Sequence, residues 1–363
     1  MKAAVCREHG APLTLEELEL ARPVGREVRV EIAACAVCHS DIAYARGAWG
    51  GDLPAVYGHE AAGIVSETGS DVEGVRPGDP VVVSLLRSCG HCAFCRGGEE
   101  HLCNGAFPAD SVPRLQTADG EPVVQGLRTA AFAEEVVVDV SQVAVVPSTL
   151  PLDLASLLGC GVITGVGAVL DNVRVAPGST VVVVGAGGVG LNVVQGARLA
   201  GAATIVAVEP SSERRAVATG FGATHGLDPG DDLAASVREL TDGRGADYVF
   251  VTVGSAPAVE RALFLVRRGG TVAVLGMPPL GESFNVVAVD LVDNDVSIVG
   301  CKIGAGSGRL ADVVPRLVRL YEEGRLALGA LVTARYPLER VNDAIDTAER
   351  GEAIRNVVVM RAG

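Results

Sequence analysis

Short runs of apolar, β-branched residues recur along the middle of the chain, and several are followed by stretches with helical spacing. The run over residues 179–184 is the plainest, because it is mostly valine and ends at a glycine-rich turn. Such a run is typical of a strand buried on both faces within a parallel sheet. Further strands are predicted over residues 204–208, 248–253, 271–275 and 296–299, and helices over residues 191–200 and 258–266. The alternation predicts a doubly wound α/β domain.

The two ends of the chain show a different pattern. Short strands separated by glycine and proline turns are predicted over residues 28–33, 62–67 and 80–84, which suggests a small all-β barrel. Near the C-terminus, helices are predicted over residues 310–323 and 340–350, and a last strand over residues 356–360.

Composition narrows the class of protein. A length of 363 residues suits two domains, and the net charge of −14 disfavours binding to the phosphate backbone of nucleic acids. Charged residues follow the N-terminus too soon for a signal peptide or a membrane span. The nine cysteines are therefore expected to be reduced thiols of a cytoplasmic protein.

Four cysteines lie close together in the sequence. Two residues separate Cys89 from Cys92 and Cys92 from Cys95, and Cys103 follows. Tetrahedral zinc takes four thiolates from a compact loop of this kind. The alternatives are CxxC redox pairs or scattered buried thiols, but redox CxxC motifs open a helix and rarely overlap. A closed set of four thiolates leaves no open coordination position, so we predict a structural zinc.

Three other residues suit a second, open metal site. Cys38, His59 and Cys160 offer two thiolates and one imidazole, which leaves a fourth position on zinc for water or substrate. Asp41 is expected to orient His59, and Glu60 places another carboxylate close to the ion. Taken singly, each residue has an ordinary alternative; Cys160, for example, would more often be a packed thiol.

The strand predicted over residues 179–184 leads directly into a GxGxxG sequence at residues 185–190. This pattern alone is common, but a preceding strand and a following helix are the context of a dinucleotide site. Glycines at its three positions allow a tight turn, close approach of a pyrophosphate and close helix packing. We therefore expect Gly185, Gly187, Gly188 and Gly190 to contact a dinucleotide.

The next predicted strand ends at Glu209, about twenty residues beyond the glycines. A carboxylate there accepts hydrogen bonds from the adenosine ribose and repels a 2′-phosphate, so NAD is favoured over NADP. Arg214 and Arg215 lie nearby, and a cation there would tolerate the extra phosphate. NADP therefore stays open as an alternative.

Together, the motifs at residues 38–41, 58–60, 89–103 and 159–161 resemble those of the zinc-dependent medium-chain alcohol dehydrogenases, within the medium-chain dehydrogenase/reductase superfamily. The resemblance covers nearly the whole chain. It implies a GroES-like β-barrel catalytic domain formed by residues 1–161 and 303–363. Residues 162–302 would then form an inserted NAD-binding Rossmann domain.

The resemblance also implies an activity, namely reversible hydride transfer between a primary or secondary alcohol and NAD, with one catalytic and one structural zinc per subunit. It assigns catalysis to Ser40, Asp41 and Glu60, cofactor contacts to His39, Thr164, Val189, Glu209, Arg214 and Arg355, and an aromatic or medium aliphatic substrate pocket to Trp49 and Leu85. Ser40 would accept the first proton. Ala43 stands where several relatives continue the relay with a histidine, so the relay must end elsewhere.

Three other functions remain open at this point. The chain suits a thiol-dependent formaldehyde dehydrogenase acting on an S-hydroxymethyl thiol, with Arg114 and Arg128 as candidates to bind the thiol's carboxylates. A lyase or epimerase can use the same zinc and NAD. A zinc-free, reductase-like binding protein would usually lack Cys38, His59 and Cys160. The family implies a homodimer or homotetramer, and residues 286–292 are expected to form a strand that pairs across a two-fold axis.

Overall fold

The structure is a computed structural model that describes residues 1–306 and 308–360. The described residues form two compact units: a discontinuous one within Met1–Gly161 and Gly308–Gly363, here called the barrel unit, and Val162–Ser307, here called the inserted unit. The second division between them lies near residue 307, a few residues beyond the expected 302.

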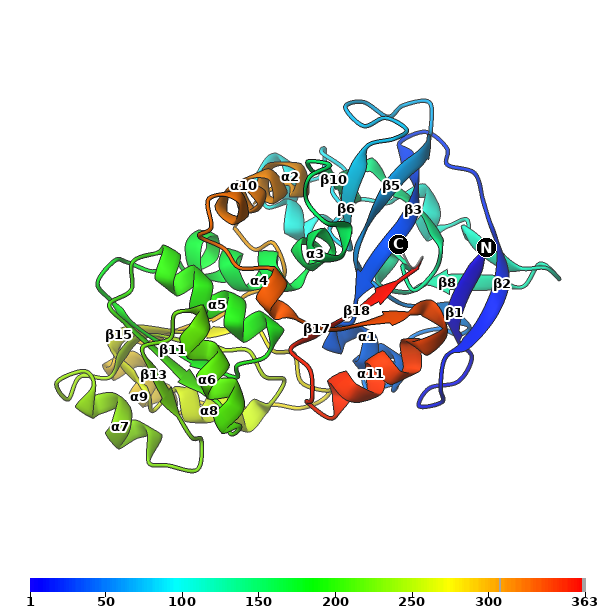
Figure 1. Cartoon of the computed structure of the whole chain (residues 1–363). Coiled ribbons are helices and arrows are strands. Elements are labelled where there is room, and N and C mark those ends of the chain that lie inside the picture. Colours follow the sequence, from blue (N-terminus) through cyan, green and yellow to red (C-terminus); the bar gives the residue numbers. More distant parts are fainter. Residues whose placement is uncertain (307, 361–363) are drawn as a thin grey trace. The chain divides into compact units, whose positions relative to one another are not determined.

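The barrel unit contains a closed five-stranded barrel and a seven-stranded sheet (Figure 1). The barrel strands, in order, are β1 (Lys2–Cys6), β2 (Thr14–Leu20), β7 (Leu115–Thr117), β8 (Pro122–Gln125) and β4 (Ala55–Val56). The sheet follows the order β10 (Val143–Val145), β6 (Pro80–Ser84), β5 (Glu60–Thr68), β3 (Glu27–Ala36), β18 (Arg355–Val359) and β17 (Val332–Pro337), and β9 (Glu135–Asp139) pairs with β3. The predicted β-barrel is thus confirmed.

Few helices accompany these strands. The α-helices of the barrel unit are α1 (His39–Ala45), α2 (Ala93–Arg96), α3 (Leu152–Ser156), α10 (Leu310–Glu322) and α11 (Val341–Glu349). One buried core joins the barrel and the sheet, and it includes Val5, Val30, Val81 and Phe132. Strand β18 pairs antiparallel with the middle of the sheet at Val358↔Cys35, so the C-terminal segment completes this unit.

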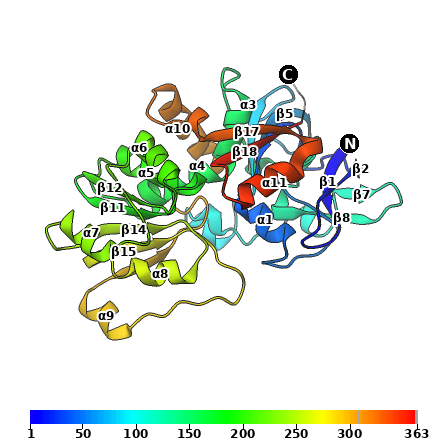
Figure 2. The ribbon, with the colours of Figure 1, turned by 60° about the horizontal axis from the view of Figure 1, so that its bottom comes forward.

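The inserted unit is a six-stranded parallel sheet with helices on both faces. Its strands follow the order β13 (His225–Leu227), β12 (Thr204–Val208), β11 (Thr180–Val184), β14 (Ala246–Val251), β15 (Val266–Val274) and β16 (Ser297–Gly300). Its helices are α4 (Gly161–Gly167), α5 (Gly188–Leu199), α6 (Ser212–Phe221), α7 (Leu233–Glu239), α8 (Ala256–Ala262) and α9 (Ala288–Asp293). Figure 2 shows α5 and α8 on opposite faces. The predicted doubly wound sheet is confirmed.

In the inserted unit, one sequence prediction holds only in part and another was wrong. The helix predicted over residues 258–266 ends at Ala262, and Val266 instead begins β15 by pairing with Ala246. The strand predicted over residues 286–292 is mostly helix α9, and the edge strand of the sheet is β16. Valines 287, 289 and 292 suggested a strand, but none of them has a strand partner, and each is at least 60% exposed.

No single helix in the described part of the chain is long and apolar enough to cross a membrane; one bent pair of helices, within residues 152–172, reaches the required length only together. All nine cysteines are free of disulfide bonds.

Candidate metal and nucleotide sites

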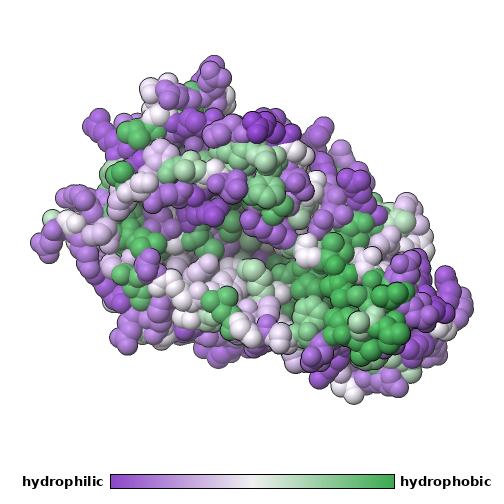
Figure 3. All heavy atoms as spheres, turned by 180° about the vertical axis from the view of Figure 1, so that it is seen from behind, coloured by the Kyte–Doolittle hydropathy of each residue, from purple (hydrophilic) through white to green (hydrophobic). Residues whose placement is uncertain are grey.

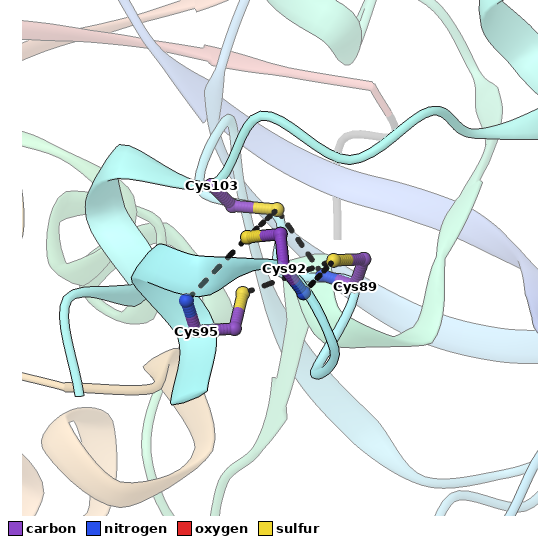
Figure 4. Close-up of side chains that lie close together, drawn as sticks. All are labelled: Cys89, Cys92, Cys95 and Cys103. Atoms are coloured by element: carbon purple, nitrogen blue, oxygen red, sulfur yellow. Dashed lines mark hydrogen bonds between the residues drawn. The ribbon is translucent and has the colours of Figure 1, made fainter. Parts of the chain in front are cut away.

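Four cysteine side chains converge in the loop that follows β6 (Figure 4). Cys92 precedes the one-turn helix α2, Cys95 lies within it, and Cys103 follows the 3-10 helix η1 (Glu100–Leu102). The Sγ atoms of Cys89 and Cys95 are 4.0 Å apart, and those of Cys92 and Cys103 are 3.9 Å apart. A disulfide needs about 2 Å, so this is the geometry of a metal cage.

Backbone amides of the same loop stabilise thiolates in this cluster. Cys92 N–H donates to Cys89 Sγ at 3.3 Å, Cys95 N–H to Cys92 Sγ at 3.4 Å, and Cys89 N–H to Cys103 Sγ at 3.3 Å. The bond from Cys95 N–H is the largest cause that lowers the pKa of Cys92, to about 6. The four-thiolate set fits a tetrahedral zinc with no open position.

The second cluster is assembled by the register of the central strands. Ala36 at the end of β3 pairs with Glu60 at the start of β5, which pairs with Ser84 at the end of β6. Cys38 follows β3 and His59 precedes β5, so both are brought to the same end of the sheet.

The position of Cys160 in this cluster depends on a hydrogen bond between two other residues, which the sequence does not signal. Ser84 Oγ donates to the carbonyl of Gly159 at 2.6 Å and so fixes the 3-10 helix η5 (Leu157–Gly159) that precedes Cys160. Gly159 has no room for a side chain, since a Cβ would lie 2.7 Å from the Val83 carbonyl oxygen. No local pattern around Ser84 signals this pairing.

The ligand atoms of Cys38, His59, Glu60 and Cys160 all lie within 4.8 Å of one another, and all four residues are buried. His59 Nδ1 lies 2.9 Å from Asp41 Oδ1, so this nitrogen carries the proton and Nε2 is left as the ligand atom. Nε2 is buried without a hydrogen-bond partner among the described residues. An orphaned imidazole nitrogen beside two thiols fits a divalent metal ion such as zinc.

Asp41, on α1, holds three parts of this cluster. Besides His59, its carboxylate accepts hydrogen bonds from the backbone N–H of Cys38 at 3.1 Å and of Gly58 at 2.9 Å. It is 1% exposed. One buried carboxylate thus fixes the backbone beside two ligands and the ring of one of them.

A buried ion pair completes the surroundings. Arg355 Nη2 lies 3.3 Å from Glu60 Oε1, and Arg355 Nη1 donates to the Val37 carbonyl at 3.2 Å. Burial raises the pKa of Glu60 to about 8, although Arg355 opposes the shift. A hydrogen bond from Cys160, together with the neighbouring His59 and Arg355, lowers the pKa of Cys38 well below its ordinary value. The role of Arg355 as a cofactor contact stays a prediction.

The other predicted site residues of the barrel unit differ in how far their side chains are exposed. Ser40 is half-buried in the first turn of α1, and His39 beside it is exposed. Trp49 packs edge-to-face on Tyr44, with ring centroids 5.3 Å apart. Leu85 follows β6 and is half-buried.

In the inserted unit, the glycine-rich turn follows β11 and opens α5. Gly185 has φ +98°, and a Cβ on Gly190 would overlap the Gly185 carbonyl oxygen. A Cβ on Gly187 would meet nothing within 4 Å, which leaves open space for a phosphate. Thr252, the residue after β14, donates from Oγ1 to the Gly185 carbonyl at 3.1 Å and secures the turn, a contact that the sequence does not signal.

Glu209 lies directly against this turn. Its Oε2 accepts from Ala186 N–H at 3.0 Å, and its Oε1 accepts from Ser211 N–H at 3.2 Å. Glu209 and Arg214 line a cavity of about 370 Å³ within the inserted unit, whereas Arg215 donates to Asp228 at 2.9 Å. Only Arg214 of the two arginines therefore borders the cavity.

Two of the predicted cofactor contacts, Thr164 and Val189, lie on helices that pack closely together. Thr164 lies on α4, and the neighbouring Gly165 packs so closely on the start of α5 that a Cβ would lie 2.6 Å from the Val189 carbonyl oxygen. Gly188 is the first residue of α5.

Comparisons with known proteins agree with this geometry. Two family models match, "Alcohol dehydrogenase GroES-like domain" at residues 25–148 and "Zinc-binding dehydrogenase" at residues 188–320. S-(hydroxymethyl)glutathione dehydrogenase of Saccharomyces cerevisiae is 37% identical over 98% of this chain and 95% of its own. Geraniol dehydrogenase of Castellaniella defragrans is 35% identical over 99% of this chain and 97% of its own. The crystal structure of benzyl alcohol dehydrogenase from Acinetobacter calcoaceticus superposes with a TM-score of 0.92 at 30% identity, over 99% of each chain.

Proposed function

Because the chain belongs to the zinc-dependent medium-chain alcohol dehydrogenases, we propose that it oxidises a primary or secondary alcohol, aromatic or medium aliphatic, with NAD as the hydride acceptor. The reaction is reversible and gives an aldehyde or a ketone. The relatives named geraniol dehydrogenase and benzyl alcohol dehydrogenase support an allylic or benzylic substrate.

The buried cluster of Cys38, His59 and Cys160 carries this proposal. These residues would hold a zinc ion with one position left open, and Cys89, Cys92, Cys95 and Cys103 would hold a second, closed zinc site. When bound, the open-site zinc makes an alcohol hydroxyl more acidic and polarises a carbonyl, and NAD accepts the hydride.

The chain's own residues supply position and proton transfer. Asp41 keeps the His59 ring in one tautomer and one orientation through the 2.9 Å hydrogen bond to Nδ1. Ser40, two residues after Cys38, lies in the first turn of α1 and would accept the hydroxyl proton. The buried Arg355 lies 3.3 Å from Glu60 beside the ligand set and opposes the rise in the pKa of Glu60 that burial causes.

The preference for NAD rests on Glu209. Its carboxylate borders the cavity of the inserted unit and would repel a 2′-phosphate, while Arg215 is paired with Asp228. Glu209→Gln should reduce the discrimination between NAD and NADP without changing the alcohol preference.

The test is NADH formation by purified, zinc-supplied protein with benzylic, allylic and aliphatic alcohols, with NAD and NADP in parallel. Turnover with an alcohol and NAD, with one NADH formed per aldehyde, is expected. Product formation without release of NADH would instead support a lyase or epimerase that uses the same parts.

A second candidate is oxidation of an S-hydroxymethyl thiol, which the similarity to S-(hydroxymethyl)glutathione dehydrogenase favours. Of the two arginines suggested for the thiol's carboxylates, Arg114 is buried and paired with Glu27 at 2.9 Å, so it is not available. Arg128 stays a candidate. Activity confined to the thiol adduct would replace the main proposal by this one.

We further propose that the protein is a homodimer or a homotetramer. Six large apolar side chains of the inserted unit are at least 60% exposed: Phe264, Met277, Leu280, Val287, Val289 and Val292. Figure 3 shows hydrophobic side chains gathered on this unit at the lower right, and such a patch usually marks an interaction site. Light scattering during gel filtration should give a multiple of the chain mass, and Leu280→Glu combined with Val292→Glu should give the monomer.

A further inference from the structure

The turn between β8 and β9 has an unusually strained backbone. It runs through the 3-10 helix η3 (Gly126–Arg128), and φ is +52° at Leu127, +62° at Arg128 and +65° at Ala130. Left-handed backbone at residues other than glycine costs free energy, and such strain clusters at ligand-binding sites. Three such residues within four positions call for an explanation.

Side chains hold the turn in this form. Gln142, 2% exposed, donates from Nε2 to the Arg128 carbonyl at 3.0 Å. Thr129 Oγ1 donates to the Leu127 carbonyl at 2.9 Å, and Gln125 Nε2 lies 3.5 Å from the Thr129 carbonyl. Strained backbone persists only where the surroundings over-determine it. Here they fix the position from which Arg128 extends.

Arg128 lines a cavity of about 470 Å³ that lies entirely within the barrel unit. Two other arginines line it, and both are paired: Arg114 with Glu27 at 2.9 Å and Arg87 with Asp110 at 2.5 Å. The Arg128 guanidinium has no hydrogen-bonded or ion-paired carboxylate within residues 1–306 and 308–360. It is the one unpaired cation of the described lining.

The local electrostatics favour an anion beside Arg128. The lining holds one more carboxylate than arginine by formal count, but three of the four carboxylates are ion-paired, Asp139 with Arg26 being the third pair. The fourth, Asp52, is exposed and is not among the groups that act most strongly on Arg128. Arg128 is itself exposed; partial loss of water and the nearby positive Arg87 lower its pKa, and Asp110 opposes the shift. The charge of a negative ligand would offset both of the unfavourable effects.

We propose that this cavity binds an organic carboxylate, with Arg128 as its principal contact. A planar guanidinium matches a carboxylate in a bidentate geometry, and a single unpaired cation suits a single negative charge. The rest of the wall is largely apolar and would receive an aromatic or short aliphatic body; it includes Leu53, Phe107, Pro113, Val123 and Val138. No ligand residue of either metal cluster lines the cavity, so the proposal does not depend on the proposed reaction.

Calorimetric titration of the zinc-supplied protein with benzoate and hexanoate tests the site, with benzamide as the uncharged analogue of benzoate. We expect one carboxylate bound per chain, at least tenfold weaker binding to the Arg128→Gln variant and partial recovery in Arg128→Lys. Arg76→Gln, which changes an exposed arginine of the same unit, should leave binding unchanged.

Arg128→Gly separates ligand binding from folding. Glycine adopts a φ of +62° without strain, so this variant should melt no lower than the parent protein while losing carboxylate binding. A melting temperature lowered by several degrees would show that Arg128 is structural and would overturn the proposal.

Carboxylates also bind metal ions, and this supplies the sharpest opposing result. Benzoate binding that survives Arg128→Gln but is lost in Cys160→Ala would place the anion at the metal cluster and overturn the proposal. Equal binding of benzamide and benzoate, or no binding of either carboxylate, would also overturn it.

Discussion

In both metal-binding clusters of the barrel unit the ligand atoms lie within 4.8 Å of one another, but the two clusters are built in opposite ways. The cluster within residues 89–103 is local, partly exposed and stabilised by N–H groups of its own loop. The cluster that contains Cys38, His59 and Cys160 is fully buried and draws its members from distant parts of the chain. Only strand register and buried polar contacts bring these members together.

This difference separates two tasks. A closed, local set of four thiolates adds stability to a loop and offers no position for a ligand. A buried three-residue set depends on the whole sheet, but it leaves one metal position open and excludes water from its other side. The two clusters should therefore respond differently to equivalent changes.

The largest expected effect is that of Cys160→Ala. Loss of this ligand should reduce kcat/KM by at least about 10³-fold, since a catalytic metal contributes several kcal/mol to transition-state stabilisation. Metal analysis should show one of two zinc ions lost. Cys35→Ala is the matched control, because Cys35, which lies on β3, is buried like Cys160 but is not a predicted ligand. Equal loss of activity in both variants would contradict the assignment.

The local cluster should show the opposite response to Cys92→Ser. Losing this zinc should lower the free energy of unfolding by about 3 kcal/mol, because metal binding to such a loop is coupled to its folding. Turnover per folded molecule, measured well below the melting temperature, should fall less than about threefold if the loop only stabilises the unit. A loss of turnover comparable to that of Cys160→Ala would show that the local cluster is not merely stabilising.

The contrast also explains what the sequence predicts. The local cluster is readable from spacing alone, because two-residue gaps bring successive sulfurs to one point. The central strands are readable because short apolar runs adjoin proline or glycine, as with Pro80 at the start of β6 and Pro210 shortly after β12; both strands have the predicted bounds. The open cluster was grouped from residue types and a family resemblance, since no local pattern relates Cys38 to Cys160.

What the sequence does not predict depends on contacts between distant residues. The apolar positions at 287, 289 and 292 suggested a strand, yet strand identity requires a partner, and the segment forms α9 instead. Ser84 and Thr252 position the site through single hydrogen bonds to distant carbonyls. The strain at Leu127 and Arg128 follows from their anchoring by surrounding side chains, and nothing in the local sequence signals it.

A smaller effect is expected for Asp41→Asn, which acts on the buried cluster through His59. An amide at this position weakens the hydrogen bond to Nδ1 and leaves one of three donors poorly matched. Metal affinity or kcat/KM should fall about 10- to 100-fold, the usual cost of losing such a partner. Asp79→Asn, which alters a carboxylate that accepts from Arg76 N–H in a turn, should leave both quantities unchanged.

The smallest effects are expected for the substitution of two serines, one beside each cluster. Ser84→Ala removes the donor to the Gly159 carbonyl, and Ser141→Ala removes the acceptor for Ser88 N–H, next to Cys89. Each loss should cost about 1–2 kcal/mol of stability, because a partner is left unsatisfied. Only Ser84→Ala should also lower kcat, by roughly 3- to 10-fold, since it releases the segment that positions Cys160.

Stopped-flow turnover and thermal melts of the two serine variants separate these contributions. If kcat falls equally in both, the local cluster also positions the reacting groups, and the division between a stabilising and a catalytic centre fails. If neither kcat changes, Cys160 is fixed by its own metal bond rather than by the sheet. The expected result, a shared loss of stability with a change of rate in Ser84→Ala alone, would show that strand register reaches the chemistry through the Gly159 carbonyl.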